Sequence, residues 1–347
     1  MTGPEQRTAP GQGAAGRTGW RGDGQQPAGQ EPGKQPGKPV RFADLTWTDL
    51  RQAAADGALV LVPLGTVEQH GPHLPVGTDT LAADFIAERI SEATGALVLP
   101  TIPYSPSAGF RNYPGTLDIG SETLRRLLED VCLALVRHGF RRIIFVNASE
   151  AAQPVIGQVA QLLRDRFGLV IGVVRPWRLG ISLLGDVYAD AVHEIGHGAE
   201  PETSALTQIS PGLVRAERVG ELPAGLVEFE GWRPVSATLA HVPGQPVGGT
   251  VYWDLERICP SGVFGRLGDF GPERGAAWVS RVTEFCIDFV REFDRNTATA
   301  AWARPPAAAP TRGGREAADP APDPDPAPDS APDPAVAALD RGPVRHR

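Results

Sequence analysis

The chain has 347 residues and a formal net charge of −8 at pH 7, with 41% hydrophobic and 21% charged residues. An acidic chain without a clustered basic face is not expected to bind nucleic acid. No apolar run is long enough to cross a bilayer, and the N-terminus lacks the apolar core of a signal peptide. Three widely spaced cysteines favour reduced thiols over a disulfide framework. These features predict a soluble, cytoplasmic protein without nucleic-acid or membrane partners.

Both ends of the chain differ in composition from the middle. Residues 1–38 are rich in Gly, Gln, Pro and Thr without hydrophobic periodicity, and residues 301–347 contain Pro-Ala-Asp repeats. Neither end can bury enough apolar surface to offset the loss of chain entropy. We therefore predict two disordered tails and one α/β domain over residues 39–300.

Apolar runs alternate with helical patterns through the central region. The predicted strands are residues 58–64, 96–100, 142–147 and 169–174. The predicted helices are residues 42–55, 79–93, 121–138 and 151–167, a short one from residue 205, and residues 272–293. Gly/Pro-broken residues 220–256 are expected to form loops with a short strand or two. This alternation predicts a mainly parallel sheet with helices on both faces.

The segment Gly65–Thr80 follows the first predicted strand and concentrates charged and imidazole side chains. Ligands bind at this end of the strands in open α/β sheets. Glu68 and His70 are two residues apart, so an extended backbone projects both to one face, and Asp79 opens the next helix. This combination of carboxylate and imidazole donors predicts a site for a divalent metal.

Simpler structural roles are open for the same residues. Asp79 can cap its helix, because Asp is a favoured N-cap residue. Glu68 and His70 can form a salt bridge within the loop, and His73 can face solvent. Short motifs of this kind arise by chance, so the pattern alone does not decide between these roles and a metal site.

Five segments, taken in chain order, resemble the creatininase (creatinine amidohydrolase) family. The longest is Leu64–Thr80, which closely resembles the family signature. The others are Tyr113–Thr116, similar to F-P-G-T; Ile144–Asn147, similar to the strand before an N-G-H-G-G-N loop; His197–Ser204, similar to H-A-G-E-x-E-T-S; and Ser261–Gly265, similar to G-V-x-G. The resemblance spans about residues 40–295.

This resemblance implies a three-layer α/β/α sandwich, often assembled as a homohexamer, that hydrolyses C–N amide bonds, frequently of cyclic or formyl amides. The family uses two divalent metal ions, Zn, Mn or Fe. By position, Glu68, His70 and Asp79 match metal ligands, with Asp79 bridging both ions. His197 and Glu202 match catalytic residues. Water activated by the metal would attack the amide carbonyl, and His197 would stabilise the oxyanion or transfer a proton.

Two loops depart from the family pattern. Ser149 stands where the family has a metal-binding imidazole, and Ala151 stands where creatininase has a glutamate ligand. A neutral hydroxyl is a poor ligand beside imidazole or carboxylate, so we expect one or two bound ions, with Glu150 as a candidate substitute donor. Gly109-Phe110 replaces a polar pair that is common in relatives.

Three functional hypotheses follow. The first, favoured by the retention of all five matched residues, is a metal-dependent amidohydrolase of a small-molecule cyclic, formyl or peptide-like amide, expected to act on non-peptide or cyclic C–N bonds. The second is a catalytically silent relative with a binding or assembly role. The third is a peptide-maturation amidohydrolase of the mycofactocin type. Fold alone does not choose between them.

Overall fold

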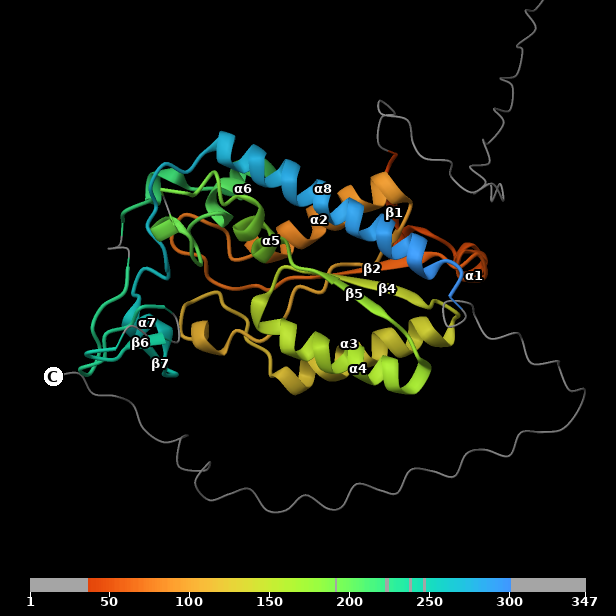
Figure 1. The fold of residues 1–347 in the computed structure, drawn as a ribbon, viewed down its shortest axis with the longest axis horizontal. Coiled ribbons are helices and arrows are strands. Elements are labelled where there is room, and N and C mark those ends of the chain that lie inside the picture. Colours follow the sequence, from red (N-terminus) through yellow and green to blue (C-terminus); the bar gives the residue numbers. More distant parts are fainter. Residues whose placement is uncertain (1–36, 191, 222–224, 237–238, 246–247, 301–347) are drawn as a thin grey trace, which may run out of the picture. The chain divides into compact units, whose positions relative to one another are not determined.

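A five-stranded parallel sheet in the order β1-β3-β2-β4-β5 forms the centre of the protein (Figure 1). Its strands are β1 (Val40–Arg41), β3 (Leu97–Val98), β2 (Leu59–Leu64), β4 (Arg142–Asn147) and β5 (Ile171–Val174). The computed structural model describes residues 37–190, 192–221, 225–236, 239–245 and 248–300. The predicted tails, residues 1–38 and 301–347, lie outside this part of the chain except for residues 37 and 38.

The two central strands, β2 and β4, are apolar on both faces. All six residues of β2 are buried, and the two strands pair along their full length from Leu59↔Arg142 to Leu64↔Asn147. Such continuous apolar runs are typical of parallel strands that helices cover on both sides. This pairing brings the carboxyl ends of β2 and β4 to the same edge of the sheet.

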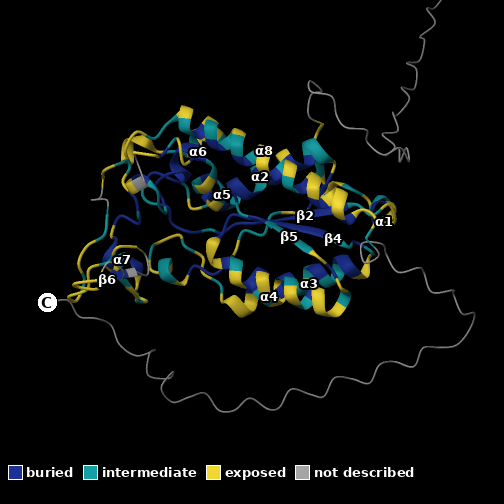
Figure 2. Ribbon diagram, viewed as in Figure 1, coloured by how far each residue is buried: buried dark blue, intermediate teal, exposed yellow. Residues whose placement is uncertain are grey.

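Helices cover both faces of the sheet, which confirms the predicted three-layer α/β/α sandwich (Figure 2). Leu59 and Leu61 of β2 pack into one hydrophobic cluster with residues of α2, α5, α6 and α8. Val60 and Val62, which point to the opposite face, pack with residues of α1, α3 and α4. The alternating directions of these side chains place one core on each side of the sheet.

The helices follow the predicted order, with differences at short or polar segments. They are α1 (Trp47–Ala55), α2 (Thr78–Thr94), α3 (Ser121–Arg137), α4 (Gln153–Phe167), α5 (Pro176–Leu183), α6 (Glu202–Ile209), α7 (Leu255–Ile258) and α8 (Pro272–Thr297). The first predicted helix starts late, at Trp47, because Thr46 and Asp49 form a capping box there. Helices α5 and α7 were not predicted.

The antiparallel pair β6 (Leu239–His241) and β7 (Gly248–Thr250) lies near α7, at the left-hand end of the view in Figure 1. It matches the prediction of a short strand or two within residues 220–256. The same end of the molecule carries the loops that leave the carboxyl ends of β2 and β4. Every described helix is too short or too polar to cross a membrane. The cytoplasmic location stays a prediction.

Candidate metal centre

Five residues predicted from the sequence gather at the carboxyl end of β2. Glu68 and His70 lie in the loop after β2, and Asp79 is in the first turn of α2. His197 lies in the loop before α6, and Glu202 is the first residue of that helix. Glu68, His70 and His197 each offer one ligand atom, and these atoms lie within 4.8 Å of one another. His70 joins the group to Asp79 and Glu202.

Gly65 allows the end of β2 to pack against the start of α2. A Cβ atom at this position would lie 2.5 Å from the backbone nitrogen and the Cα of Thr80, so any side chain would push the two segments apart. Two hydrogen bonds close the loop between them: Thr80 Oγ1 donates to the Thr66 carbonyl (3.1 Å), and the Glu68 amide donates to the Val76 carbonyl (2.8 Å). This close packing brings Glu68 and Asp79 into one site.

The His70 imidazole faces two carboxylates with its Nε2 atom. Its Nδ1–H donates to the backbone carbonyl of Glu68 (2.9 Å), which leaves Nε2 to hold either a proton or a metal ion. Nε2 lies 3.2 Å from Asp79 Oδ1 and 3.7 Å from Glu202 Oε2. It is buried and has no hydrogen-bond partner. A lone pair that faces carboxylate oxygens requires a proton or a metal ion between them.

His197 is held in the same way. Its Nε2–H donates to the backbone carbonyl of Gln69 (2.6 Å), so Nδ1 carries the lone pair and lies 3.7 Å from Glu68 Oε1. The ring packs against His70 and stacks on Phe110, each with a centroid distance of 4.3 Å. Backbone carbonyls therefore fix the tautomers of both imidazoles, as is usual for histidines that bind metals.

Hydrogen bonds from outside the cluster also orient two of the carboxylates. The indole N–H of Trp177 donates to Asp79 Oδ1 (2.8 Å), and the backbone N–H of Gly198 donates to Glu202 Oε2 (2.6 Å). Both carboxylates are more than nine-tenths buried. The site thus holds its acidic side chains in fixed positions away from water.

Burial dominates the electrostatics of the cluster. It raises the pKa of Glu68 to about 8 and that of Glu202 to about 7. Burial by itself would lower the pKa of His70, but Asp79, Glu202 and Glu68 outweigh it and raise that pKa to about 10. Burial, assisted by repulsion from His70, lowers the pKa of His197 well below its usual value. Several buried acidic groups with so few cationic partners favour binding of a positive ion.

Residues 43–290 match the protein-family model described as creatininase, creatinine amidohydrolase, which is well over half of the chain. The chain belongs to the creatininase family.

Individual relatives agree with this assignment. Creatinine amidohydrolase of Pseudomonas putida is 29% identical over 223 residues, which cover 60% of this chain and 86% of the relative. Mycofactocin precursor peptide peptidase of Mycobacterium tuberculosis is 33% identical over 174 residues, which cover 46% of this chain and 61% of that protein. A solved structure of creatininase with manganese is 25% identical and superimposes with a TM-score of 0.60, covering 74% of this chain and 98% of its own.

The structure does not support the simpler structural roles that the sequence left open for Asp79, for the Glu68–His70 pair and for His73. Asp79 makes no side-chain cap for α2. The free nitrogen of His70 faces Asp79 and Glu202, while its other nitrogen bonds the Glu68 backbone. His73 is fully buried, and its Nε2 lies 2.9 Å from the hydroxyl of Thr203.

The loop that departs from the creatininase pattern supplies no metal donor in this structure. The Ser149 hydroxyl is buried and hydrogen-bonded to the Ser105 hydroxyl (2.7 Å). Glu150 is half exposed and paired with Arg175, and its carboxylate lies outside the cluster. In this structure Arg175 therefore neutralises Glu150 at the surface, and the role of Glu150 as a substitute donor stays a prediction.

Several residues that shape this site were not predicted from the sequence to do so. Trp177 lies outside all five of the family-like segments, and its bond to Asp79 joins residues 98 positions apart. Gln69 was read as part of the signature, yet its side chain ties the loop to the Gly262 carbonyl (3.1 Å). Glu200 is the first glutamate of the H-A-G-E-x-E-T-S motif. That motif was the one signal that pointed to it.

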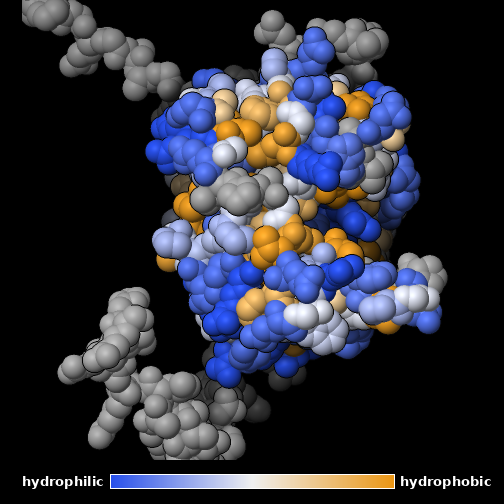
Figure 3. Space-filling view, turned by 90° about the vertical axis from the view of Figure 1, so that its left-hand side faces the viewer, coloured by the Kyte–Doolittle hydropathy of each residue, from blue (hydrophilic) through white to orange (hydrophobic). Residues whose placement is uncertain are grey.

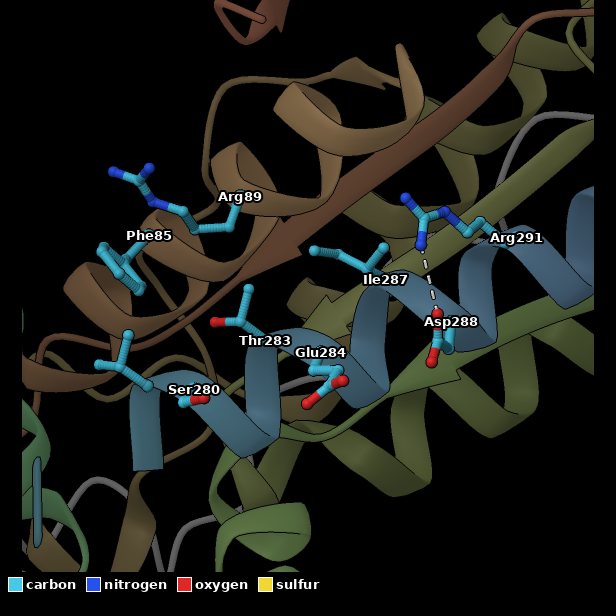
Figure 4. Close-up of a pocket in the computed structure, with 9 residues that line it drawn as sticks. Phe85, Arg89, Ser280, Thr283, Glu284, Ile287, Asp288 and Arg291 are labelled. Carbon is cyan, nitrogen blue, oxygen red and sulfur yellow. Dashed lines mark hydrogen bonds and ion pairs between the residues drawn. The ribbon is translucent and has the colours of Figure 1, made fainter. Parts of the chain in front are cut away.

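A second hollow of the surface is a groove between α2 and α8 (Figure 4). Phe85 and Ile287 line it together with Arg89 and Glu284, and Arg291 pairs with Asp288 along its rim. It contains neither imidazole nor thiol among its described residues, and its charges of both signs are exposed to solvent. The groove therefore has the character of an ordinary surface between two helices.

The pKa values predict how the stability of the metal-free protein depends on pH. Carboxyl groups with a raised pKa stabilise the fold below their unfolded pKa, and this contribution is lost as pH rises toward about 7 for Glu202 and about 8 for Glu68. His70, raised from 6.5 to about 10, has the same sign. His73 and His197, whose pKa values are lowered, act in the opposite direction only below pH 6.5.

We therefore expect the free energy of unfolding of the metal-free protein to fall between pH 6.5 and pH 8. Each group contributes at most about 1.4 kcal/mol per pH unit. Urea denaturation at several pH values measures this slope. Saturating Mn²⁺ should abolish or reverse it, because a bound cation favours the ionised carboxylates. A metal-free protein that gains stability over this interval would contradict the assignment.

Proposed function

We propose that the chain is a metal-dependent amidohydrolase that hydrolyses a C–N amide bond, with divalent metal bound among His70, Asp79, Glu202 and Glu68. The observation that carries this proposal is the buried Nε2 of His70, which has no hydrogen-bond partner and lies between the carboxylates of Asp79 and Glu202. A cation at this position would satisfy the imidazole lone pair and both acidic groups together.

The donor set fits a divalent ion. Imidazole nitrogen combined with carboxylate oxygen suits Zn²⁺, Mn²⁺ or Fe²⁺, whereas soft thiolate sites select other metals. The three free cysteines, Cys132, Cys259 and Cys286, are absent from the cluster. Relatives solved with manganese are consistent with this chemistry. We place Glu202, which was expected to be catalytic, with the metal ligands because its Oε2 faces the same nitrogen as Asp79.

A bound ion in such a site polarises the substrate carbonyl and lowers the pKa of water. The remaining roles fall to the side chains. His197 offers an unprotonated Nδ1 beside Glu68, so it can accept a proton from the attacking water and pass it to the leaving nitrogen. Trp177 and the Gly198 amide keep Asp79 and Glu202 oriented while this occurs. Phe110 and Phe264 shield the imidazole from solvent.

The proposed substrate class is broader than the sequence suggested. The expectation of a non-peptide or cyclic amide is not confirmed, since one relative is a peptidase of a precursor peptide. We therefore propose an amide of either a small molecule or a peptide as the substrate. Assembly as a homohexamer stays a prediction, which light scattering of the purified protein tests.

Metal-dependent hydrolysis is the test of the proposed function. The full chain, stripped of metal and reloaded with Mn²⁺ or Zn²⁺, should hydrolyse at least one member of a panel that contains creatinine, an N-formyl amide and short peptides. Activity should disappear on chelation and return with the metal. The Glu150→Ala variant is the matched control, because this carboxylate lies at the surface outside the cluster and its loss should leave turnover unchanged.

Two outcomes contradict the proposal in different ways. A protein that binds no divalent metal lacks the proposed centre altogether. A protein that binds metal but hydrolyses nothing in the panel would favour the second hypothesis, a silent relative that uses the same scaffold for binding. In that case Phe110→Ala, which removes the ring stacked on His197, would be the first variant to make.

A further inference from the structure

We propose that the cluster binds a single divalent ion per chain and that a wall of neutral hydroxyls excludes a second one. This inference rests on the proposed function and concerns the number of ions. Two groups of donors could each hold an ion: one contains Glu68, His70 and His197, and the other contains His70, Asp79 and Glu202.

The two groups share one atom. Nδ1 of His70 is committed to the backbone carbonyl of Glu68, so Nε2 is the only nitrogen that this imidazole can offer to either group. The lone pair of an imidazole nitrogen binds one ion. The two groups are therefore alternative positions for the ion that His70 binds. A second ion would lack this imidazole, and Glu68 and His197 could reach the three protein donors that a catalytic site normally has only by sharing the Asp79 carboxylate with the first ion.

No further strong donor is available on the facing wall among the described residues. This wall consists of segment 105–107 and the loops after β2 and β4. Their hydroxyl groups are hydrogen-bonded to one another in pairs. Ser105 pairs with Ser149 (2.7 Å), and Ser107 pairs with Thr66 (3.1 Å), all four side chains being buried. Ser107 also hydrogen-bonds the Glu68 carboxylate. Glu150, the nearest acidic residue along this loop, pairs with Arg175 at the surface.

Neutral hydroxyls cannot replace these missing donors. They bind divalent transition metals weakly compared with imidazole or carboxylate, and here a second ion would also have to break two buried hydroxyl pairs. The wall therefore holds Glu68 by hydrogen bonding but does not bind an ion itself. The ion binds on the side of the site that contains His70. The hydroxyl pairs serve as a boundary of the metal site.

Metal stoichiometry tests the inference directly. The full chain, freed of metal by chelation, is titrated with Mn²⁺ by calorimetry, and the bound metal is measured after gel filtration. We expect one Mn²⁺ per chain and the six-line electron paramagnetic resonance spectrum of an isolated ion. Two Mn²⁺ per chain with an exchange-coupled spectrum would overturn the single-ion inference but leave the proposed function intact. No bound Mn²⁺ would overturn the proposed function and this inference together.

A pair of variants tests the role of the hydroxyl wall. Ser149→His adds a nitrogen donor to the wall, and we expect the ratio to rise from one Mn²⁺ per chain to two. Ser149→Ala, the matched control, removes the hydroxyl without adding a donor and should stay at one. A folded Ser149→His protein that stays at one would contradict the role given to the wall. Should this variant fail to fold, the ratio for the unaltered chain still decides the number of ions.

Discussion

Replacing His70 with alanine should remove metal binding almost completely. His70 belongs to both donor groups, and its Nε2 lies 3.2 Å from Asp79 and 3.7 Å from Glu202. Mutation of residues that only orient ligands typically costs about 10- to 100-fold in metal affinity, so loss of this ligand should exceed about 100-fold. Calorimetric titration with Mn²⁺ measures the difference, and hydrolytic activity should fall at least in proportion.

A thermal-shift experiment reports the same loss through stability. Metal at 100 times its dissociation constant stabilises the folded protein by about 2.7 kcal/mol. For a domain of this size, this corresponds to a rise in melting temperature of about 5–10 °C. The unaltered chain should show this rise and His70→Ala should not.

Trp177→Phe provides a graded comparison for His70→Ala. It removes only the N–H group that donates to Asp79 and keeps an aromatic ring in the core beside Trp278. We expect a loss of about 10- to 100-fold in metal affinity, smaller than that of His70→Ala. If both variants bind Mn²⁺ as tightly as the unaltered chain, the metal does not occupy this cluster.

Replacing Glu200 should have the largest effect on stability among the residues near the site. Its carboxylate is fully buried and accepts hydrogen bonds from the hydroxyls of Tyr188 (2.6 Å) and Ser204 (2.7 Å). Its backbone also binds Glu194 and Gly196, which closes the loop that contains His197. Glu200→Ala leaves two buried hydroxyls without an acceptor, and each costs about 1–3 kcal/mol. Urea denaturation should therefore show a loss of several kcal/mol.

The metal affinity of variants in this network separates a positioning role from a purely structural one. Glu200→Gln keeps the shape and one acceptor oxygen, so we expect a smaller loss of stability than for alanine. Tyr188→Phe removes a single hydrogen bond and should cost about 1–3 kcal/mol. If Glu200 positions the loop, Mn²⁺ affinity should fall in the same order as stability, because His197 and Glu202 lie on either side of it. Unchanged Mn²⁺ affinity in a destabilised but folded Glu200→Ala protein would restrict Glu200 to a structural role.

The parts of the fold that the sequence predicts well are those set by local patterns. Strand β2 and helices α2 and α4 have clear patterns of apolar residues, and their ends lie within about two residues of the predicted positions. Helix α5, which contains Pro176 and Gly180, was not predicted. In the structure Pro176 occupies the first turn, and Gly180 permits the close approach of Trp278. These contacts depend on segments distant in the chain.

The same distinction applies to the site. Glu68, His70 and Asp79 could be grouped from the sequence because all three lie within one loop and the helix that follows it. The direction of Glu150 could not, because it depends on Arg175, which β5 brings beside it. Nor does the sequence show that Ser149 meets Ser105, since this contact requires the loop after β4 to fold against segment 105–107. Pairings between distant loops are decided only by the tertiary fold.

Aromatic neighbours limit the space around His197, the residue proposed to transfer a proton. Its imidazole packs beside His70 and stacks on Phe110, each with a centroid distance of 4.3 Å, and its Nε2–H donates to the Gln69 carbonyl. Nδ1 is therefore the nitrogen left for a proton transfer. Seen from the end of the molecule that carries these loops, apolar side chains lie across the middle of the surface (Figure 3). If His197 transfers the proton as proposed, the ring of Phe110, stacked on it at 4.3 Å, favours amides with little bulk beside the nitrogen.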